Sequence, residues 1–286
     1  MLKIGAHMKI SKGFSKVPEV TINIGGNTFQ IFTHSPRVWR ITKLKENDVK
    51  GFKENMNKLN INFEDVLVHS SYLINLASPK EDVWEKSIKT MIEEIKATND
   101  LGIIHYNFHP GSHLNEGEEF GINRILKALD LIFKEVEATN VIVLLENVAK
   151  KGSNIGYSME QLGKIINTSY WKERLGITYD TCHGFDSNYD IREKDDVKRL
   201  INDIERNMGL EKLKMIHLND SKYEVGAGKD RHEFIAKGYI GRKGFETFLS
   251  FNEFNKLPLL LETPGDDPEH SQDIKTIKEI FEGLKK

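Results

Sequence analysis

The sequence predicts an α/β protein, and its pattern favours a closed (β/α)8 barrel formed by a single domain over residues 1–286. Eight short apolar segments alternate along the chain with amphipathic segments of helical period. Buried strands that alternate with helices indicate a parallel sheet, and eight such units suit a barrel, which typically takes roughly 250 residues. An open doubly wound sheet is the alternative. We find no internal repeat, low-complexity tract or linker that would divide the chain.

The predicted strands are short, apolar and spread over the whole chain. They are LKIGAH (2–7), TFQIFT (28–33), DVLVHS (65–70), HYNFHP (105–110), VIVLLEN (141–147), LGITYDT (175–181), KMIHLND (214–220) and LPLLLET (257–263).

The predicted helices follow these strands. Ser78-Pro79-Lys80-Glu81 has the form of a capping box with Pro at the first helical position. Apolar residues recur at helical spacing behind it, and again over 122–136 and 197–208. Asp267-Pro268 opens the last predicted helix, and the segment 11–27 has the least clear pattern.

Composition limits the classes of protein. The chain has 286 residues, of which 38% are apolar and 29% charged, as in a soluble globular protein. With a net charge of −2, contact with nucleic acid requires a local basic patch. A lone cysteine, Cys182, forms no internal disulfide and suits a reducing cytoplasm. We expect no signal peptide and no membrane partner, because no stretch reaches the roughly 20 apolar residues of a membrane span.

Seven of the eight predicted strands end at an imidazole or a carboxylate. These residues are His7, His69, His109, Glu146, Asp180, His217 and Glu262. A barrel brings the C-terminal ends of its strands to one rim, where active sites are built. The seven side chains are therefore expected around one opening.

Such a ring needs positive charge at its centre, because clustered carboxylates repel one another. Mixed imidazole and carboxylate ligands favour Zn²⁺, Mn²⁺ or Fe²⁺ over Mg²⁺ or Ca²⁺. The number of groups fits two or three ions. His183 lies just beyond Asp180, and Asp230 and His232 return on a later loop, where an extended backbone would place both on one side.

Several blocks of the sequence resemble endonuclease IV, the metal-dependent apurinic/apyrimidinic endonuclease family of DNA base-excision repair. The resemblance covers nearly the whole chain. It is carried by GAHMKIS, FTHSPRVWR, HSSYLINLASP, NFHPGSH, LLENVAKKGSNIG, YDTCHGFDSNYD, HLNDSKYEVGAGKDRHEFIAKGYIG and LPLLLETP. It implies a TIM barrel with three zinc ions, and manganese is an alternative metal at one or more positions.

The resemblance also implies a set of metal ligands. The first zinc would be held by His69, His109 and Glu146, the second by Glu146, Asp180, His217 and Glu262, and the third by His183, Asp230 and His232. The sequence departs from the family pattern at Ser70, where an aspartate is expected, and this affects the surroundings of His69 rather than metal binding. For His7 two readings stay open: support of a metal ligand, or a hydrogen bond inside the rim.

The implied substrate is double-stranded DNA that contains an abasic site or a blocked 3′ end. The hypothesis is that a metal-bridging hydroxide attacks the phosphorus 5′ to the abasic sugar, leaving a 3′-hydroxyl and a 5′-deoxyribose phosphate. Glu146 and Glu262 are the predicted catalytic residues, with Glu262 orienting or deprotonating the nucleophile. Arg37, Tyr72 and Leu73 match the loops that enter DNA. Further phosphate contacts are expected from Lys150, Lys151, Lys222, Lys229, Lys237 and Arg242. The family precedent indicates a monomer.

Two other functions remain open from the residues alone. A divalent-metal sugar isomerase or epimerase would use one or two metals and leave Asp230-Arg231-His232 idle. A zinc-stabilised barrel could instead recognise damaged DNA without cutting it. Single residues also have structural explanations: His105 is expected in the barrel interior, His113 is unassigned, and Cys182 is expected to be buried and inert.

Overall fold

The computed structural model describes residues 1–285, and position 286 of the predicted domain lies outside the described residues. Within residues 1–285, eight parallel strands form a closed barrel in the order β1-β10-β7-β6-β5-β4-β3-β2. They are β1 (Ile4–His7), β2 (Thr28–Ile31), β3 (Leu67–His69), β4 (His105–Phe108), β5 (Ile142–Glu146), β6 (Leu175–Asp180), β7 (Leu213–His217) and β10 (Leu259–Leu261). Each overlaps a predicted strand.

The barrel closes at β1, which pairs in parallel with β2 on one side and with β10 on the other. This closure confirms the (β/α)8 prediction and rules out the open doubly wound sheet. Closure depends on Gly5, because a Cβ atom there would lie 1.6 Å from the carbonyl oxygen of Thr28 on β2. Glycine therefore permits the close approach of the first two strands.

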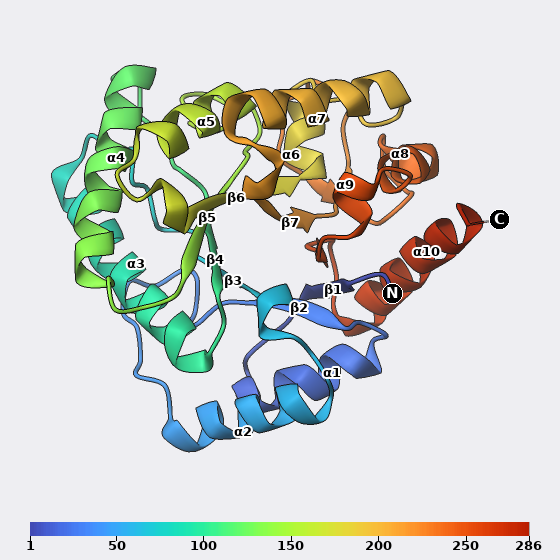
Figure 1. Cartoon of the computed structure of the whole chain (residues 1–286), viewed down its shortest axis with the longest axis horizontal. Coiled ribbons are helices and arrows are strands. Elements are labelled where there is room, and N and C mark those ends of the chain that lie inside the picture. Colours follow the sequence, from blue (N-terminus) through green and yellow to red (C-terminus); the bar gives the residue numbers. More distant parts are fainter. Residues whose placement is uncertain (286) are drawn as a thin grey trace.

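Helices surround the barrel (Figure 1). They are α1 (Val17–Asn23), α2 (Glu46–Lys58), α3 (Glu81–Leu101), α4 (Glu118–Glu135), α5 (Met159–Thr168), α6 (Thr181–Asp186), α7 (Lys194–Met208), α8 (Gly241–Leu249), α9 (Asn252–Asn255) and α10 (Asp267–Gly283). Short 3₁₀ turns occupy Phe14–Lys16, Phe63–Asp65, Lys172–Arg174 and Leu210–Lys212. The apolar faces of the helices pack against the outer side of the strands in one continuous core.

The predicted capping box at Ser78 is wrong. Lys80 has an extended backbone (ψ 112°), so α3 begins only at Glu81 and has no side-chain cap. The Ser78 hydroxyl instead accepts a hydrogen bond from the backbone N–H of Lys80 (3.1 Å) within the preceding turn. A capping box does form at α10, where Asp266 and Glu269 cap each other's backbone.

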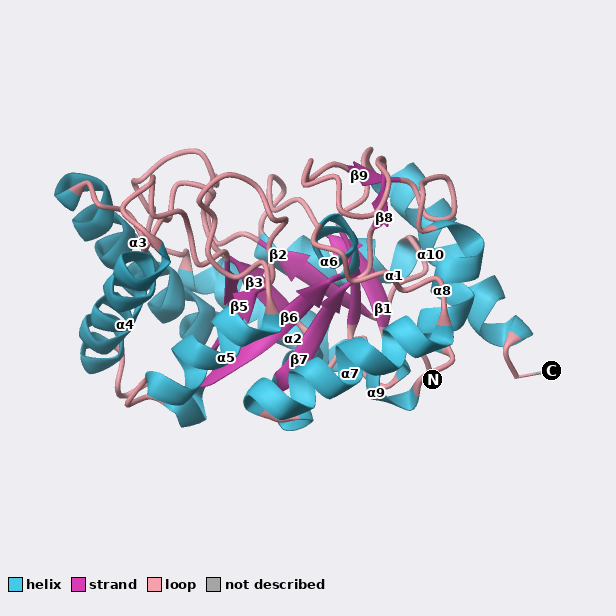
Figure 2. Ribbon diagram, turned by 90° about the horizontal axis from the view of Figure 1, so that it is seen from above, coloured by secondary structure: helices cyan, strands magenta, loops and turns pink. Residues whose placement is uncertain are grey.

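The long loops gather along one side of the molecule, above the strands (Figure 2). The loop after β7 forms a small antiparallel pair there, made of β8 (Asp220–Ser221) and β9 (His232–Glu233). Among the residues that the structure describes, no helix is long and apolar enough to cross a membrane.

Replacing Gly5 with alanine should destabilise the barrel, because the new methyl group would force β1 away from β2. We expect the free energy of unfolding to fall by about 2 kcal/mol or more. Gly283→Ala is the control, since a Cβ there meets no atom within 4 Å. It should change stability by less than about 1 kcal/mol, and toward greater stability, because alanine favours helix. Urea unfolding curves measure both, and equal curves would contradict the role given to Gly5.

Candidate metal centre

The predicted ligands stand above an apolar plug inside the barrel. Leu67, Leu144, Met215 and Leu260 form a separate buried cluster contributed by β3, β5, β7 and β10. Each of them lies two residues before a predicted ligand, namely His69, Glu146, His217 and Glu262. Because side chains on a strand alternate between its faces, residues two apart point to the same side. The plug and the ligands thus form successive layers, and the ligands lie at the open end.

The structure brings all nine predicted ligands together in three groups. In each group the ligand atoms lie within 4.8 Å of one another. The groups are His69, His109 and Glu146; then Glu146, Asp180, His217 and Glu262; then His183, Asp230 and His232. These are the sets that the family resemblance implied, with Glu146 shared by the first two. Each set combines imidazole nitrogen with carboxylate oxygen, which suits a zinc-like cation.

Three of the five histidines are oriented by main-chain oxygens. Nδ1 of His69 lies 2.8 Å from the carbonyl oxygen of Ser70, Nδ1 of His183 lies 2.9 Å from that of Asn147, and Nδ1 of His232 lies 3.0 Å from that of Glu262. A carbonyl only accepts, so Nδ1 carries a proton, and Nε2 is the nitrogen that remains to bind a cation. Since the anchor of His69 is a backbone oxygen, it does not depend on the side chain at Ser70.

The polar end of the barrel fits a metal in two respects. Nε2 of His232 is buried and has no hydrogen-bond partner among the described residues, although a carboxylate oxygen of Asp180 lies 3.7 Å away. Such an atom costs free energy unless something satisfies it. The donor set is also chemically suitable, because it consists of imidazoles and carboxylates held close together without a thiolate. The chain could therefore hold one cation in each group.

Electrostatic coupling is strong at the shared carboxylate. Burial alone would raise the pKa of Glu146, but the surrounding imidazoles, His217 foremost, hold it well below its usual value. Burial likewise opposes charge on His217, yet the facing Glu146 and Glu262 raise its pKa to about 9. The pKa of Glu262 falls to about 2, against the effect of burial, mainly because of His217. The carboxylates are thus held ionised and require positive charge nearby.

The third group depends on the loop between β7 and α8. The predicted extended backbone at Asp230 is wrong, because Asp230 has φ of 54°. Asp186, in α6, holds this turn by accepting hydrogen bonds from the backbone N–H of Lys229 (3.0 Å) and of Asp230. The Asp230 carboxylate then lies 3.1 Å from Nε2 of His183. Asp186 is a supporting residue that the sequence argument missed.

Gln30 on β2 was also missed, although β2 is the one predicted strand that does not end at an imidazole or a carboxylate. Its Oε1 lies 2.6 Å from Nε2 of His217, and its Nε2 donates to Glu262 (2.6 Å) and lies 2.8 Å from Nδ1 of His7. Because Oε1 can only accept, His217 carries a proton on Nε2, and its Nδ1 is the nitrogen that faces Glu146, 3.0 Å away. The signal in the sequence was a glutamine inside the apolar run TFQIFT.

The structure also shows the surroundings of the remaining residues that the sequence analysis discussed. Nδ1 of His7 lies 2.8 Å from Gln30 and 3.9 Å from a carboxylate oxygen of Glu262, and burial lowers the pKa of His7 to about 3. His105 lies 3.0 Å from the carbonyl oxygen of Glu64, and His113 accepts from the N–H of Gly117, so both have structural contacts. Cys182 is fully buried and burial raises its pKa, which opposes a thiolate even though it lies near Asp180 and His232.

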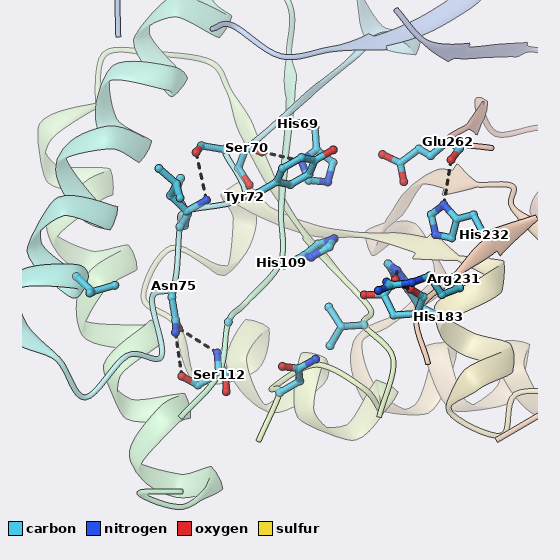
Figure 3. Close-up of a pocket in the computed structure, with 18 residues that line it drawn as sticks. His69, Ser70, Tyr72, Asn75, His109, Ser112, His183, Arg231, His232 and Glu262 are labelled. Atoms are coloured by element: carbon cyan, nitrogen blue, oxygen red, sulfur yellow. Dashed lines mark hydrogen bonds and ion pairs between the residues drawn. The ribbon is translucent and has the colours of Figure 1, made fainter. Parts of the chain in front are cut away.

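A cavity of about 770 Å³ opens beside the three groups. Figure 3 shows His69, His109, His183, His232 and Glu262 along one part of it, with Asn75 and Ser112 at the other end. Tyr72 stands at its edge and is 61% exposed, Leu73 is half-buried and Arg37 is exposed. The six predicted phosphate contacts, Lys150, Lys151, Lys222, Lys229, Lys237 and Arg242, are all exposed.

A barrel with such a rim belongs to a known structural class. A family model described as a xylose isomerase-like TIM barrel matches residues 19–286. A solved structure of a D-tagatose 3-epimerase-like protein superposes with a TM-score of 0.76 over 99% of this chain and 98% of that one. Its sequence identity is 17%, so this likeness shows the fold alone.

Closer relatives identify the family. A protein of Petrotoga mobilis (strain DSM 10674 / SJ95), named probable endonuclease 4, is 77% identical over 286 residues and is matched along 100% of both chains. The crystal structure of endonuclease IV from Thermus thermophilus has a TM-score of 0.86 at 26% identity, covering 98% of this chain and 99% of that one. The chain belongs to the endonuclease IV family, which confirms the resemblance found in the sequence.

Replacing Gln30 with methionine should weaken metal binding, because His217 loses the acceptor that fixes its tautomer. Removing such a support typically weakens metal affinity about 10- to 100-fold. Competition with a coloured zinc chelator measures this loss, and imidazole ¹⁵N shifts report the tautomer of His217. Gln272→Met, on the exposed face of α10, is the matched control and should bind metal as the wild type does. Wild-type affinity in Gln30→Met would contradict this role.

Proposed function

We propose that this protein is a zinc-dependent endonuclease of DNA base-excision repair. It would hydrolyse the phosphodiester bond 5′ to an abasic site in double-stranded DNA, leaving a 3′-hydroxyl and a 5′-deoxyribose phosphate. The observation that carries the proposal is the triple grouping of nine ligand side chains at the mouth of one cavity. Family membership supports the same activity.

Three zinc ions would be held by the nine residues in the three groups described above. Bound zinc would supply positive charge to the phosphate and lower the pKa of water toward neutrality. Manganese would suit the same nitrogen and oxygen donors at one or more positions.

The two predicted catalytic carboxylates, Glu146 and Glu262, would have different roles. Glu146 is fully buried between the first two groups and would fix their relative position. Glu262 lines the cavity, and its side chain is 18% exposed. One of its oxygens accepts from Gln30, and the other lies 3.3 Å from His217. Glu262 would therefore orient the attacking water, or take its proton, beside bound DNA.

The rim loops would recognise the DNA. An abasic nucleotide is readily extruded from the duplex, because it has no base pair and little stacking to lose. Tyr72 and Leu73 would fill the space left in the helix, and Arg37 would enter beside them, as side chains do in other kinked complexes. The six exposed cations around the rim would contact phosphates and give salt-sensitive affinity.

Other parts of the proposal follow from family membership and composition. The same cavity would accept a blocked 3′ end, which gives a 3′-phosphodiesterase activity. The chain would act as one domain over residues 1–286, as a monomer and in the cytoplasm. His7 would support Glu262 and His217 through Gln30.

Metal content and incision test the proposal together. We expect about three zinc per chain by elemental analysis, because the ligands form three groups. Incision of a synthetic abasic duplex should stop after chelation and return with zinc. One ion per chain without incision would favour a sugar isomerase or epimerase, whereas tight binding of an uncut duplex would favour a damage-recognition protein.

Glu262→Gln should lower kcat for abasic incision by about 100-fold or more, because an amide neither takes a proton nor balances metal charge as a carboxylate does. Affinity for the abasic duplex should change little. Single-turnover rates and binding by fluorescence anisotropy separate the two effects. Glu269→Gln, on the exposed first turn of α10, serves as the control. Incision at the wild-type rate by Glu262→Gln would remove this residue from catalysis.

A further inference from the structure

A buried carboxyl group lies outside the metal centre. Glu94 is in the middle of α3 and is only 1% exposed, beside the apolar residues Met91 and Ile95. A carboxyl group buried on the apolar face of a helix costs free energy unless strong partners compensate it. The partners of Glu94 therefore indicate its role.

Those partners come from three separate segments around the rim. Oε1 of Glu94 accepts a hydrogen bond from the backbone N–H of Ser71 (3.0 Å), in the loop after β3. The same oxygen lies 3.4 Å from Nδ1 of His34, in the loop after β2. The hydroxyl of Tyr106, on β4, donates to Oε2 and ties the carboxyl group to the barrel wall.

On the first loop, the contacts of His34 fix the backbone around Arg37. His34 is buried, and its Nε2 lies 3.1 Å from the carbonyl oxygen of Val38. The ring therefore spans the segment between positions 34 and 38, and exposed Arg37 projects from that segment.

On the second loop, Ser71 connects Glu94 to both loops. Its hydroxyl donates to the carbonyl oxygen of Pro36 (2.9 Å), and the backbone N–H of Tyr72 donates to the same oxygen (3.1 Å). Pro36 directly precedes Arg37. The two exposed side chains, Arg37 and Tyr72, thus stand on loops that meet at one carbonyl oxygen and share one buried carboxyl group.

The protonation of His34 and Glu94 accounts for their contact. Nε2 of His34 faces a carbonyl oxygen and carries a proton, so a neutral ring has its lone pair on Nδ1, which lies 3.4 Å from Glu94 and 3.3 Å from the hydroxyl of Thr33. A proton on either group makes that contact attractive. Burial raises the pKa of Glu94 to about 7 and lowers that of His34, so each group favours its neutral form. One proton held within the pair satisfies both without adding net charge to the interior.

We propose that Glu94 and His34 form a buried clamp that holds the Arg37 and Tyr72 loops in one joint conformation, ready to enter DNA. This inference rests on the proposed function, because it takes duplex DNA as the partner of these loops. Glu94 and His34 are positioning residues: they contact neither DNA nor the three ligand groups. A preordered pair of loops loses less conformational entropy on binding than two independent loops.

Glu94→Ala and His34→Ala test the clamp, and Glu93→Ala is the matched control. Glu93 is the neighbouring residue on α3, and its side chain is exposed and contacts Lys96 (3.2 Å). We expect KM for abasic duplex to rise about tenfold in both clamp variants, because the loops must be ordered on binding. Their kcat should stay within about twofold of the wild type. Zinc content and hydrolysis of the small substrate bis(p-nitrophenyl) phosphate should not change.

Hydrogen–deuterium exchange provides a readout that needs no activity. The backbone amides of Ser71 and Tyr72 should exchange faster in both clamp variants and at the wild-type rate in Glu93→Ala. Glu94→Gln should lie closer to the wild type than Glu94→Ala, because its amide oxygen can still accept from Ser71. His34→Ala leaves α3 unaltered and so tests the clamp even if Glu94→Ala fails to fold.

Two results would overturn the clamp: wild-type exchange and KM in His34→Ala, or a loss confined to kcat. Failure of the proposed function is distinguishable from failure of the clamp. If the wild-type protein with full zinc left abasic DNA uncut, the activity would be wrong. Faster exchange at Ser71 and Tyr72 in the variants would still establish the joint loop structure.

Discussion

One buried carboxylate organises the open end of this barrel. Glu146 has no exposed surface, and nitrogen atoms of His69, His109, His183 and His217 all lie within 3.3 Å of its oxygens. A buried charge without compensation is strongly destabilising, so positive charge must face this carboxylate in every folded state. Imidazolium groups or bound cations both meet that need. Since two ligand groups share Glu146, the occupation of one group affects the charge felt by the other.

The geometry of the ligands is fixed largely by main-chain oxygens and amide side chains. Carbonyl oxygens set the protonated nitrogen of three histidines, and Gln30 does the same for His217 with the opposite nitrogen. A histidine whose tautomer is fixed before the metal arrives needs little rearrangement on binding. A backbone anchor also tolerates change in the neighbouring side chain, so the orientation of His69 does not depend on Ser70, where an aspartate was expected.

The barrel itself does not distinguish among the functions that this fold supports. A D-tagatose 3-epimerase-like protein shares the architecture, and function resides in the groups mounted on it. Two features beyond the barrel strands shape this rim. The loop after β7 brings Asp230 and His232 to a third ligand group, and Asp186 holds its turn. The loops after β2 and β3 both contact the buried Glu94, and they present exposed side chains beside the cavity.

The residues alone predicted the strands, favoured the closed barrel over an open sheet, and placed a ring of imidazoles and carboxylates at its rim. Apolar runs and a two-residue period are local properties, and a barrel brings every strand end to one rim, as for Glu146. The residues that hold the ring and the loops in place became visible only in the folded structure. Gln30, Asp186 and Glu94 act through hydrogen bonds to distant segments, and neither spacing nor composition reveals such partners. The start of α3 was likewise set by the extended backbone at Lys80, which local capping rules did not foresee. Long-range packing chose these conformations over local preference.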